Sequence, residues 1–238
     1  MTKRVQAWHG WGFGPTAFDP LRSALADCCE LSALALTAPG SGDFETWSSE
    51  LAKQVSSGEV LLGWSLGAML ALAAVAAGAR PRALVLIGAS PRFVASADWP
   101  HGLDAGTVST FRSGVAEHPA RTLKRFLALQ TLGDSQRSAA QALLEPALET
   151  DATKLSPALS ALINADLRTC VGQIRVPTLL LHGENDALMP LRAATWLVDH
   201  LPNARLIVLP QCGHAPHVTQ AHQVADALMQ FLGSLPDA

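Results

Sequence analysis

The chain has 238 residues, 49% of them hydrophobic and 16% charged, which fits one large α/β domain, or a core with a small insertion, around a well-buried interior. Its formal net charge of −3 offers no overall basic field, so a nucleic-acid-binding protein is disfavoured. The apolar patch at residues 5–8 is far too short for a signal peptide or a membrane span, so we expect a soluble cytoplasmic protein without a membrane partner.

The first part of the sequence alternates between strand-like and helix-like segments. We expect strands at residues 3–8, 31–36, 60–64 and 83–87, and helices at residues 17–28, 45–55 and 66–77. Thr16 and Asp43 are the predicted N-caps of the first two helices. This order implies right-handed crossovers and a mainly parallel sheet with helices on both faces.

The pattern changes after residue 90. Residues 92–165 contain no convincing strand, and helical apolar spacing appears at residues 105–114, 119–132 and 135–148. Strands at residues 178–181 and 204–209 and helices at residues 191–200 and 218–232 then follow. We therefore expect a core made of residues 1–90 and 166–238, and a helical lid at residues 91–165.

A G-x-S-x-G pattern, Gly63-Trp64-Ser65-Leu66-Gly67, lies where the strand at residues 60–64 meets the helix at residues 66–77. A serine on such a sharp turn needs unusual backbone angles and small neighbours. The turn exposes the hydroxyl and aims the first N–H groups of the helix at the atom under attack. Ser65 is therefore the candidate nucleophile.

A serine nucleophile needs a base and a third group that orients the base, and these collect on loops after the carboxyl ends of strands. Asp186 is the predicted acid after the strand at residues 178–181, with Glu184 as the competitor. His214 is the predicted base after the strand at residues 204–209. His217 is the competing histidine, and we expect it to cap the final helix or lie at the surface.

An ester carbonyl that becomes an oxyanion needs two N–H donors. The predicted donors are the backbone N–H groups of Leu66 and of Trp11, in the glycine-rich loop after the first strand. His9 is expected to brace this loop by hydrogen bonds. Trp11 and Trp64 flank the predicted site, where Trp64 either lines an acyl pocket or packs in the core.

Basic residues gather in the expected lid: Arg121, Lys124, Arg125 and Arg137. Arg121 and Arg125 are four residues apart and so share one face of a helix. The cluster is either a solvated face or a dock for an acidic partner.

These residues resemble the α/β-hydrolase superfamily, through the loop His9-Gly10-Trp11-Gly12, the turn at residues 38–42, the G-x-S-x-G pattern and the loops of Asp186 and His214. More narrowly, the chain resembles the biotin-pathway esterases that hydrolyse pimeloyl-acyl carrier protein methyl ester. The motifs that carry this narrower resemblance are Gly63-Trp64-Ser65-Leu66-Gly67, Trp99-Pro100, the lid sequence Arg-Phe-Leu-Ala-Leu-Gln-Thr at residues 125–131, and His214-Ala215-Pro216.

The resemblance implies an α/β-hydrolase fold with a helical lid insertion. Most members have two further strands before the His-Gly loop strand, so we expect a mainly parallel sheet of about six strands with the first two missing. It also implies a serine carboxylesterase. We expect a monomer, and serine chemistry of this kind needs no cofactor or metal. The substrate of this esterase would be a methyl-esterified pimeloyl group on acyl carrier protein, and its products the free acid and methanol.

Residue roles follow from the same resemblance. Phe111 and Phe126 would line the acyl channel with Trp11, and Arg121 and Arg125 would contact the acidic carrier protein. The family has two more arginines in the next helix, where this chain offers only Arg137, slightly out of register. The alternative is the same chemistry on another substrate, as in a general short-chain carboxylesterase, a lactonase or a carbon–carbon bond hydrolase.

Overall fold

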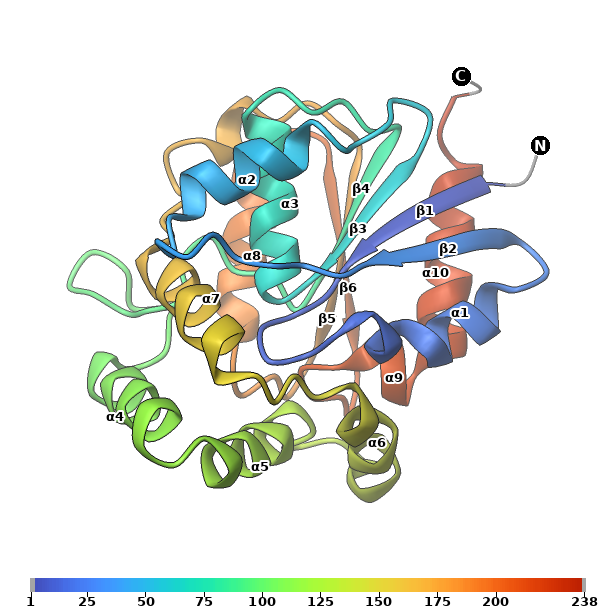
Figure 1. Cartoon of the computed structure of the whole chain (residues 1–238). Coiled ribbons are helices and arrows are strands. Elements are labelled where there is room, and N and C mark those ends of the chain that lie inside the picture. Colours follow the sequence, from blue (N-terminus) through green and yellow to red (C-terminus); the bar gives the residue numbers. More distant parts are fainter. Residues whose placement is uncertain (1–2, 237–238) are drawn as a thin grey trace.

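The protein is built around one six-stranded parallel sheet, seen in a computed structural model that describes residues 3–236 (Figure 1). The strands are β1 Lys3–Trp8, β2 Cys29–Leu34, β3 Val60–Trp64, β4 Ala83–Ile87, β5 Thr178–Gly183 and β6 Ala204–Leu209. Their order across the sheet is β2-β1-β3-β4-β5-β6, and every neighbouring pair is parallel. Val5 of β1, for example, is in register with Leu31 of β2 and with Val60 of β3.

Helices cover both faces of the sheet, because the central strands are apolar on both sides. Every residue of β3, β4 and β5 is buried, whereas the edge strands β2 and β6 are partly exposed. The flanking helices are α1 Asp19–Leu25, α2 Phe44–Ala52, α3 Leu66–Ala76, α8 Leu191–His200, α9 Pro216–Thr219 and α10 Ala221–Gly233. The helices α2, α3 and α8 lie on one face, and α1 and α10 on the other (Figure 1).

Several helices begin or end at other residues than predicted, and prolines lie at these boundaries. The helix expected at residues 17–28 is a 3-10 helix, Pro15–Phe18, followed by α1, and Thr16 lies inside the 3-10 helix instead of capping it. Proline occupies the first positions of both pieces, where its fixed φ favours a new start. The predicted cap Asp43 is confirmed, since its carboxylate accepts the Thr46 N–H at 2.9 Å.

The segment between β4 and β5 contains four α-helices and no strand. These are α4 Ala105–Glu117, α5 Pro119–Gln130, α6 Arg137–Leu144 and α7 Ala152–Asn164, and α4, α5 and α6 form the lower layer in Figure 1. The helix expected at residues 135–148 ends earlier, and a 3-10 turn, Glu145–Ala147, contains Pro146. Helix α7 was not expected from the sequence, because it carries Pro157 inside it.

The final helix was expected at residues 218–232 and is divided in the structure. The short helix α9 turns back toward the core before α10 packs along α1. Within residues 3–236, no helix combines the length and apolarity that crossing a membrane requires.

Candidate active site

Ser65 lies on a strained turn between β3 and α3. Its φ of 57° and ψ of −118° fall in a region of backbone angles that residues other than glycine rarely adopt, at a cost of about 1–3 kcal/mol. A methyl group on Gly63 would lie 2.4 Å from the Gly67 carbonyl oxygen, and one on Gly67 would lie 2.0 Å from the Trp8 carbonyl oxygen. Both glycines are therefore required by close backbone contacts, as the G-x-S-x-G pattern predicts.

Asp186 and His214 meet at the carboxyl ends of β5 and β6. The distance from His214 Nδ1 to Asp186 Oδ2 is 2.6 Å, and both side chains are buried. Because a carboxylate only accepts hydrogen bonds, Nδ1 carries the proton and Nε2 is left as the free base. Among the residues that the structure describes, nothing hydrogen-bonds to that buried Nε2.

The imidazole ring of His214 is also held sterically. Gly88 follows β4 with a φ of +54°, and a methyl group there would lie 2.9 Å from Cε1 and Nδ1 of His214. The indole N–H of Trp64 donates to the His214 carbonyl oxygen at 2.9 Å. Trp64 is fully buried and packs in the core, which is the second of the two roles that the sequence left open.

Glu184, the competing acid, is exposed and turned away from the base. Its carboxylate accepts the Gln211 N–H at 3.2 Å, and the geometry therefore favours Asp186.

Oδ1 of Asp186 accepts the N–H groups of Leu188 at 2.9 Å and Met189 at 2.8 Å. Burial alone would raise the pKa of Asp186, but His214, His182 and the Met189 N–H together hold that pKa below its usual value.

The loop after β1 passes directly beside Ser65. A methyl group on Gly10 would lie 3.2 Å from the Ser65 Cβ, so the next residue, Trp11, is close to the nucleophile. Leu66 is the first residue of α3, and its N–H therefore has no acceptor within the helix. Trp11 and Leu66, the two predicted oxyanion donors, also line one cavity.

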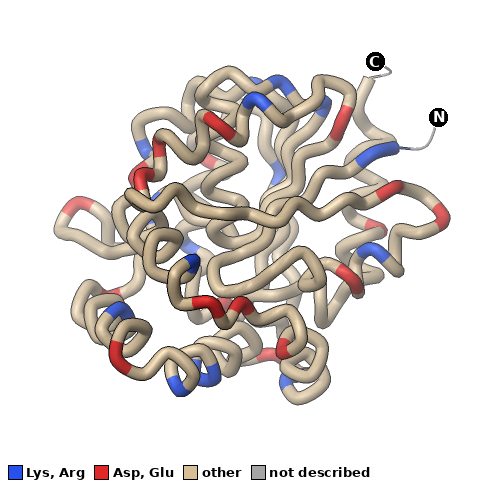
Figure 2. The backbone as a smooth tube through the Cα atoms, in the orientation of Figure 1, with Lys and Arg blue, Asp and Glu red and all other residues tan. Residues whose placement is uncertain are grey.

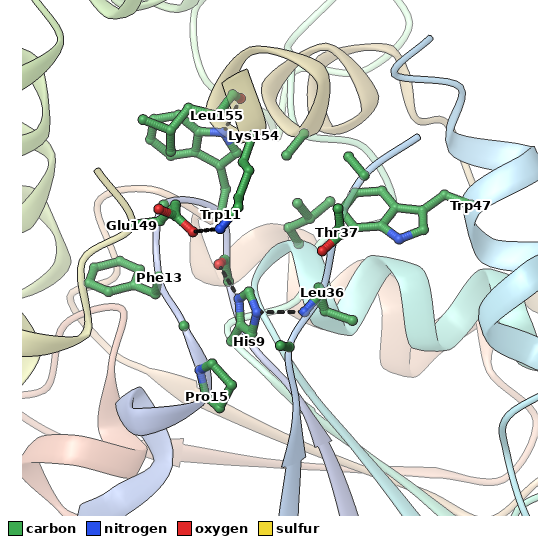
Figure 3. Close-up of a pocket in the computed structure, with 17 residues that line it drawn as sticks. His9, Trp11, Phe13, Pro15, Leu36, Thr37, Trp47, Glu149, Lys154 and Leu155 are labelled. Atoms are coloured by element: carbon green, nitrogen blue, oxygen red, sulfur yellow. Dashed lines mark hydrogen bonds and ion pairs between the residues drawn. The ribbon is translucent and has the colours of Figure 1, made fainter. Parts of the chain in front are cut away.

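His9 braces this loop, as the sequence analysis expected (Figure 3). Its Nε2 accepts the Leu36 N–H at 3.0 Å, so Nδ1 carries the proton and donates to the Gly10 carbonyl oxygen at 3.0 Å. Burial lowers the pKa of His9, which keeps the ring neutral. A cavity of about 90 Å³ lies behind the loop, and the ion pair between Lys154 and Glu149, 3.0 Å long, borders it (Figure 3).

Phe111 and Phe126, the predicted acyl-channel residues, both reach Trp11. Their ring centroids lie 5.2 and 4.8 Å from that of Trp11, in edge-to-face arrangements. The Trp11 indole N–H donates to the Leu155 carbonyl oxygen of α7 at 2.9 Å. The aromatic cluster therefore joins the segment between β4 and β5 to the loop beside Ser65.

The predicted position of His217 is wrong. The side chain is fully buried in α9, with its ring 4.5 Å from Trp64 and 5.1 Å from Phe18 between centroids. Neither ring nitrogen has a hydrogen-bond partner among the described residues. Burial, with a smaller contribution from His214, lowers the pKa of His217 to about 3.

The chain is similar to known proteins over most of its length. The family model described as "Alpha/beta hydrolase family" matches residues 7–227. A curated relative from Aromatoleum aromaticum, named "Pimeloyl-[acyl-carrier protein] methyl ester esterase", is 40% identical over 234 residues, which cover 91% of this chain and 93% of the relative. A relative of the same name from Nitrosomonas europaea is 34% identical and covers 90% of both chains.

The chain belongs to the alpha/beta hydrolase family. Two solved structures show the same fold at low sequence identity. An esterase from Exiguobacterium antarcticum has a TM-score of 0.87 at 20% identity and covers 98% of this chain and 92% of its own. A bromoperoxidase from Bacillus anthracis has a TM-score of 0.85 at 21% identity, with coverages of 98% and 93%. The expected α/β-hydrolase fold with six parallel strands is confirmed.

The end of α5 and the connection to α6 are hydrogen-bonded to the loops that carry Asp186 and His214. The sequence did not predict these contacts. The backbone N–H of His214 donates to the Gln130 carbonyl oxygen at 2.8 Å, and that of Ser135 to Gln211 at 3.0 Å. Asn185 donates its amide N–H to the Gly133 carbonyl oxygen at 2.9 Å. Such backbone contacts leave no pattern in residue types, so no signal in the sequence pointed to them.

We predict that His217→Phe reduces the loss of stability on acidification. The unfolded state takes up a proton near the ordinary histidine pKa of 6.5, whereas folded His217 does not until about pH 3, so stability falls as pH drops below 6.5. Between pH 7.5 and 5.5 this one group costs about 1 kcal/mol of unfolding free energy. Urea denaturation at the two pH values measures the difference.

The control is His222→Phe, at an exposed position of α10. It should leave the pH dependence of stability as in the wild type. An unchanged pH dependence in His217→Phe would show that the folded protein protonates His217 as readily as the unfolded chain does.

Proposed function

We propose that this chain is a serine carboxylesterase that hydrolyses the methyl ester of pimeloyl-acyl carrier protein in biotin synthesis. The observation that carries the proposal is the buried 2.6 Å contact between His214 and Asp186. The strained Ser65 directly follows Trp64, whose indole N–H donates to the His214 carbonyl oxygen. The names of relatives at 34–40% identity supply the substrate. A nucleophile, a base and an orienting acid suit acyl transfer from an ester.

The reaction takes two steps. Nε2 of His214 accepts the proton from the Ser65 hydroxyl as its oxygen attacks the ester carbonyl carbon, and the N–H groups of Leu66 and Trp11 bind the oxyanion. Collapse of this intermediate breaks the bond to the methoxy group, which leaves as methanol with the proton from His214. Water, deprotonated by His214, then attacks the acyl-serine. Collapse of this second intermediate breaks the bond to the Ser65 oxygen, which regains its proton from His214, and the free acid leaves. Asp186 keeps the proton on Nδ1 throughout, so that Nε2 can exchange protons with the substrate.

In this proposal, residues 91–165 act as a lid and supply the acyl channel. Phe111 of α4 and Phe126 of α5 meet Trp11 edge to face, and such an apolar surface suits the methylene chain of a pimeloyl group. Ser65 is only 7% exposed beneath it. A long apolar chain would therefore reach the serine between these rings.

The acidic carrier protein would dock on α5. A groove of about 550 Å³ between α4 and α5 is lined by Arg121 and Arg125 and reaches Phe111 and Phe126. Both arginines are exposed, and within residues 3–236 neither is in an ion pair with a carboxylate. Figure 2 shows the Lys and Arg positions on these helices, along the lower edge of the molecule. Unpaired surface cations steer an acidic partner toward the groove.

The test of the chemistry uses methyl-pimeloyl carrier protein and mass spectrometry of the intact carrier. Wild-type enzyme should make the carrier lighter by one methylene group, and Ser65→Ala should slow this reaction by at least about 1000-fold, the scale of losing a nucleophile. The matched control is Ser49→Ala, on the exposed surface of α2. Substantial turnover by Ser65→Ala would refute the assignment, and turnover of simple esters alone would favour a general short-chain carboxylesterase.

The test of the docking surface is charge reversal. Arg121→Glu with Arg125→Glu should raise KM for the carrier-linked ester about 10-fold or more at low salt, because attraction becomes repulsion, and should leave kcat/KM for a small free ester unchanged. The pair Lys53→Glu with Arg205→Glu makes the same change of charge just after α2 and on β6, and should have no effect. Equal losses on both substrates would mean that the two lid arginines serve the structure.

A further inference from the structure

We propose that His182 is a positioning residue that fixes the acid loop and so holds Asp186 against His214. The inference rests on the proposed serine-esterase chemistry, but not on the carrier-bound substrate. His182 lies near the end of β5, four residues before Asp186, and is 1% exposed. The proposed reaction gives this buried histidine no role.

The hydrogen bond of His182 determines its tautomer. Its Nε2 lies 2.7 Å from the Met189 carbonyl oxygen, and since a carbonyl oxygen only accepts, Nε2 carries the proton. Burial lowers the pKa of His182, despite the nearby carboxylate of Asp186, and so favours the neutral ring. The residue therefore presents one fixed N–H to the inside of the acid loop.

The same ring nitrogen also lies near the carboxylate. The distance from His182 Nε2 to Oδ2 of Asp186 is 3.4 Å, and Oδ2 is the oxygen that accepts from His214. Oδ1 of the same carboxylate accepts the N–H groups of Leu188 and Met189. Backbone N–H groups thus hold Oδ1, and the His214 N–H holds Oδ2 with His182 Nε2 close by, which favours the ionised form that orients the base.

Met189 connects the two halves of this arrangement. Its carbonyl oxygen is held by His182, while its N–H holds Oδ1 of Asp186. Without the His182 N–H, the Met189 carbonyl would be a buried acceptor without its donor, which favours rearrangement of the loop. A carboxylate that turns with the loop would no longer hold the Nδ1 proton of His214 in place.

Three substitutions separate the N–H from the packing of the ring. The amide nitrogen of His182→Gln reaches roughly the position of Nε2 and keeps the donor, whereas the shorter His182→Asn reaches only the position of Nδ1. His182→Phe fills the space without a donor. With p-nitrophenyl acetate, we expect His182→Gln to stay within about threefold of wild type. His182→Asn and His182→Phe should lose about 10- to 100-fold in kcat with KM nearly unchanged, the range typical of losing a hydrogen bond that orients a functional group.

Proton NMR supplies a readout that a purely structural role would not change. A short hydrogen bond between Nδ1 and a carboxylate gives a far-downfield proton signal, which His214→Gln removes and thereby assigns. We expect the signal in wild type and His182→Gln, and its loss or upfield shift in His182→Asn and His182→Phe. Thermal unfolding is measured for each variant to check that it folds. If the phenylalanine variant does not fold, the comparison of the glutamine and asparagine variants still tests the role of the His182 N–H.

Two results would overturn the inference: wild-type kcat and an unchanged signal in His182→Asn, or equal losses in the glutamine and asparagine variants. Failure of the proposed function would look different. Wild-type protein would then neither hydrolyse the simple ester nor label at Ser65 with a fluorophosphonate, while the NMR comparison would still report on His182 and Asp186.

Discussion

The close approach of α3 to the end of β1 is the constraint on which the site depends. A methyl group on Gly67 would overlap the Trp8 carbonyl oxygen, so the first turn of α3 lies directly on the backbone that leads into the His9–Gly10 loop. This contact places Gly10 against Ser65, and with it Trp11 near the first N–H groups of α3. The positive φ of Ser65 is maintained because the well-packed strands on either side leave the turn no room to relax.

The segment between β4 and β5 belongs to the site as much as the sheet does. It contacts the loop beside Ser65 through the Glu149 N–H, which donates to the Gly12 carbonyl oxygen at 2.9 Å, and the base loop through the Gln130 carbonyl oxygen. The helix that carries Arg121 and Arg125 therefore ends on the residue that accepts from the His214 N–H. In the proposed function, a carrier protein on α5 would sit one helix length from the catalytic base, on an element hydrogen-bonded to it.

Local chemistry made much of the fold and the meeting of the site residues predictable. Continuous apolar runs predict the buried central strands, and close backbone contacts explain the glycines around Ser65. The order of Ser65, Asp186 and His214 places each after a strand of one parallel sheet. The misses have other causes. Pro157 concealed α7, and His217 reads as a polar helix start, although a short turn directs it into the core. The contacts of His182 depend on tertiary packing that no spacing reveals.

In the proposed function, this chain is a serine esterase whose substrate is a carrier-bound methyl ester. The most direct test of this proposal is the ratio of kcat/KM for methyl-pimeloyl carrier protein to that for a free methyl ester of the same chain length, at low ionic strength. We predict a ratio of about 10 or more that falls as salt is added, because exposed charges on α5 contribute to the encounter. A ratio near one at every salt concentration would contradict the proposal that the enzyme recognises the carrier protein.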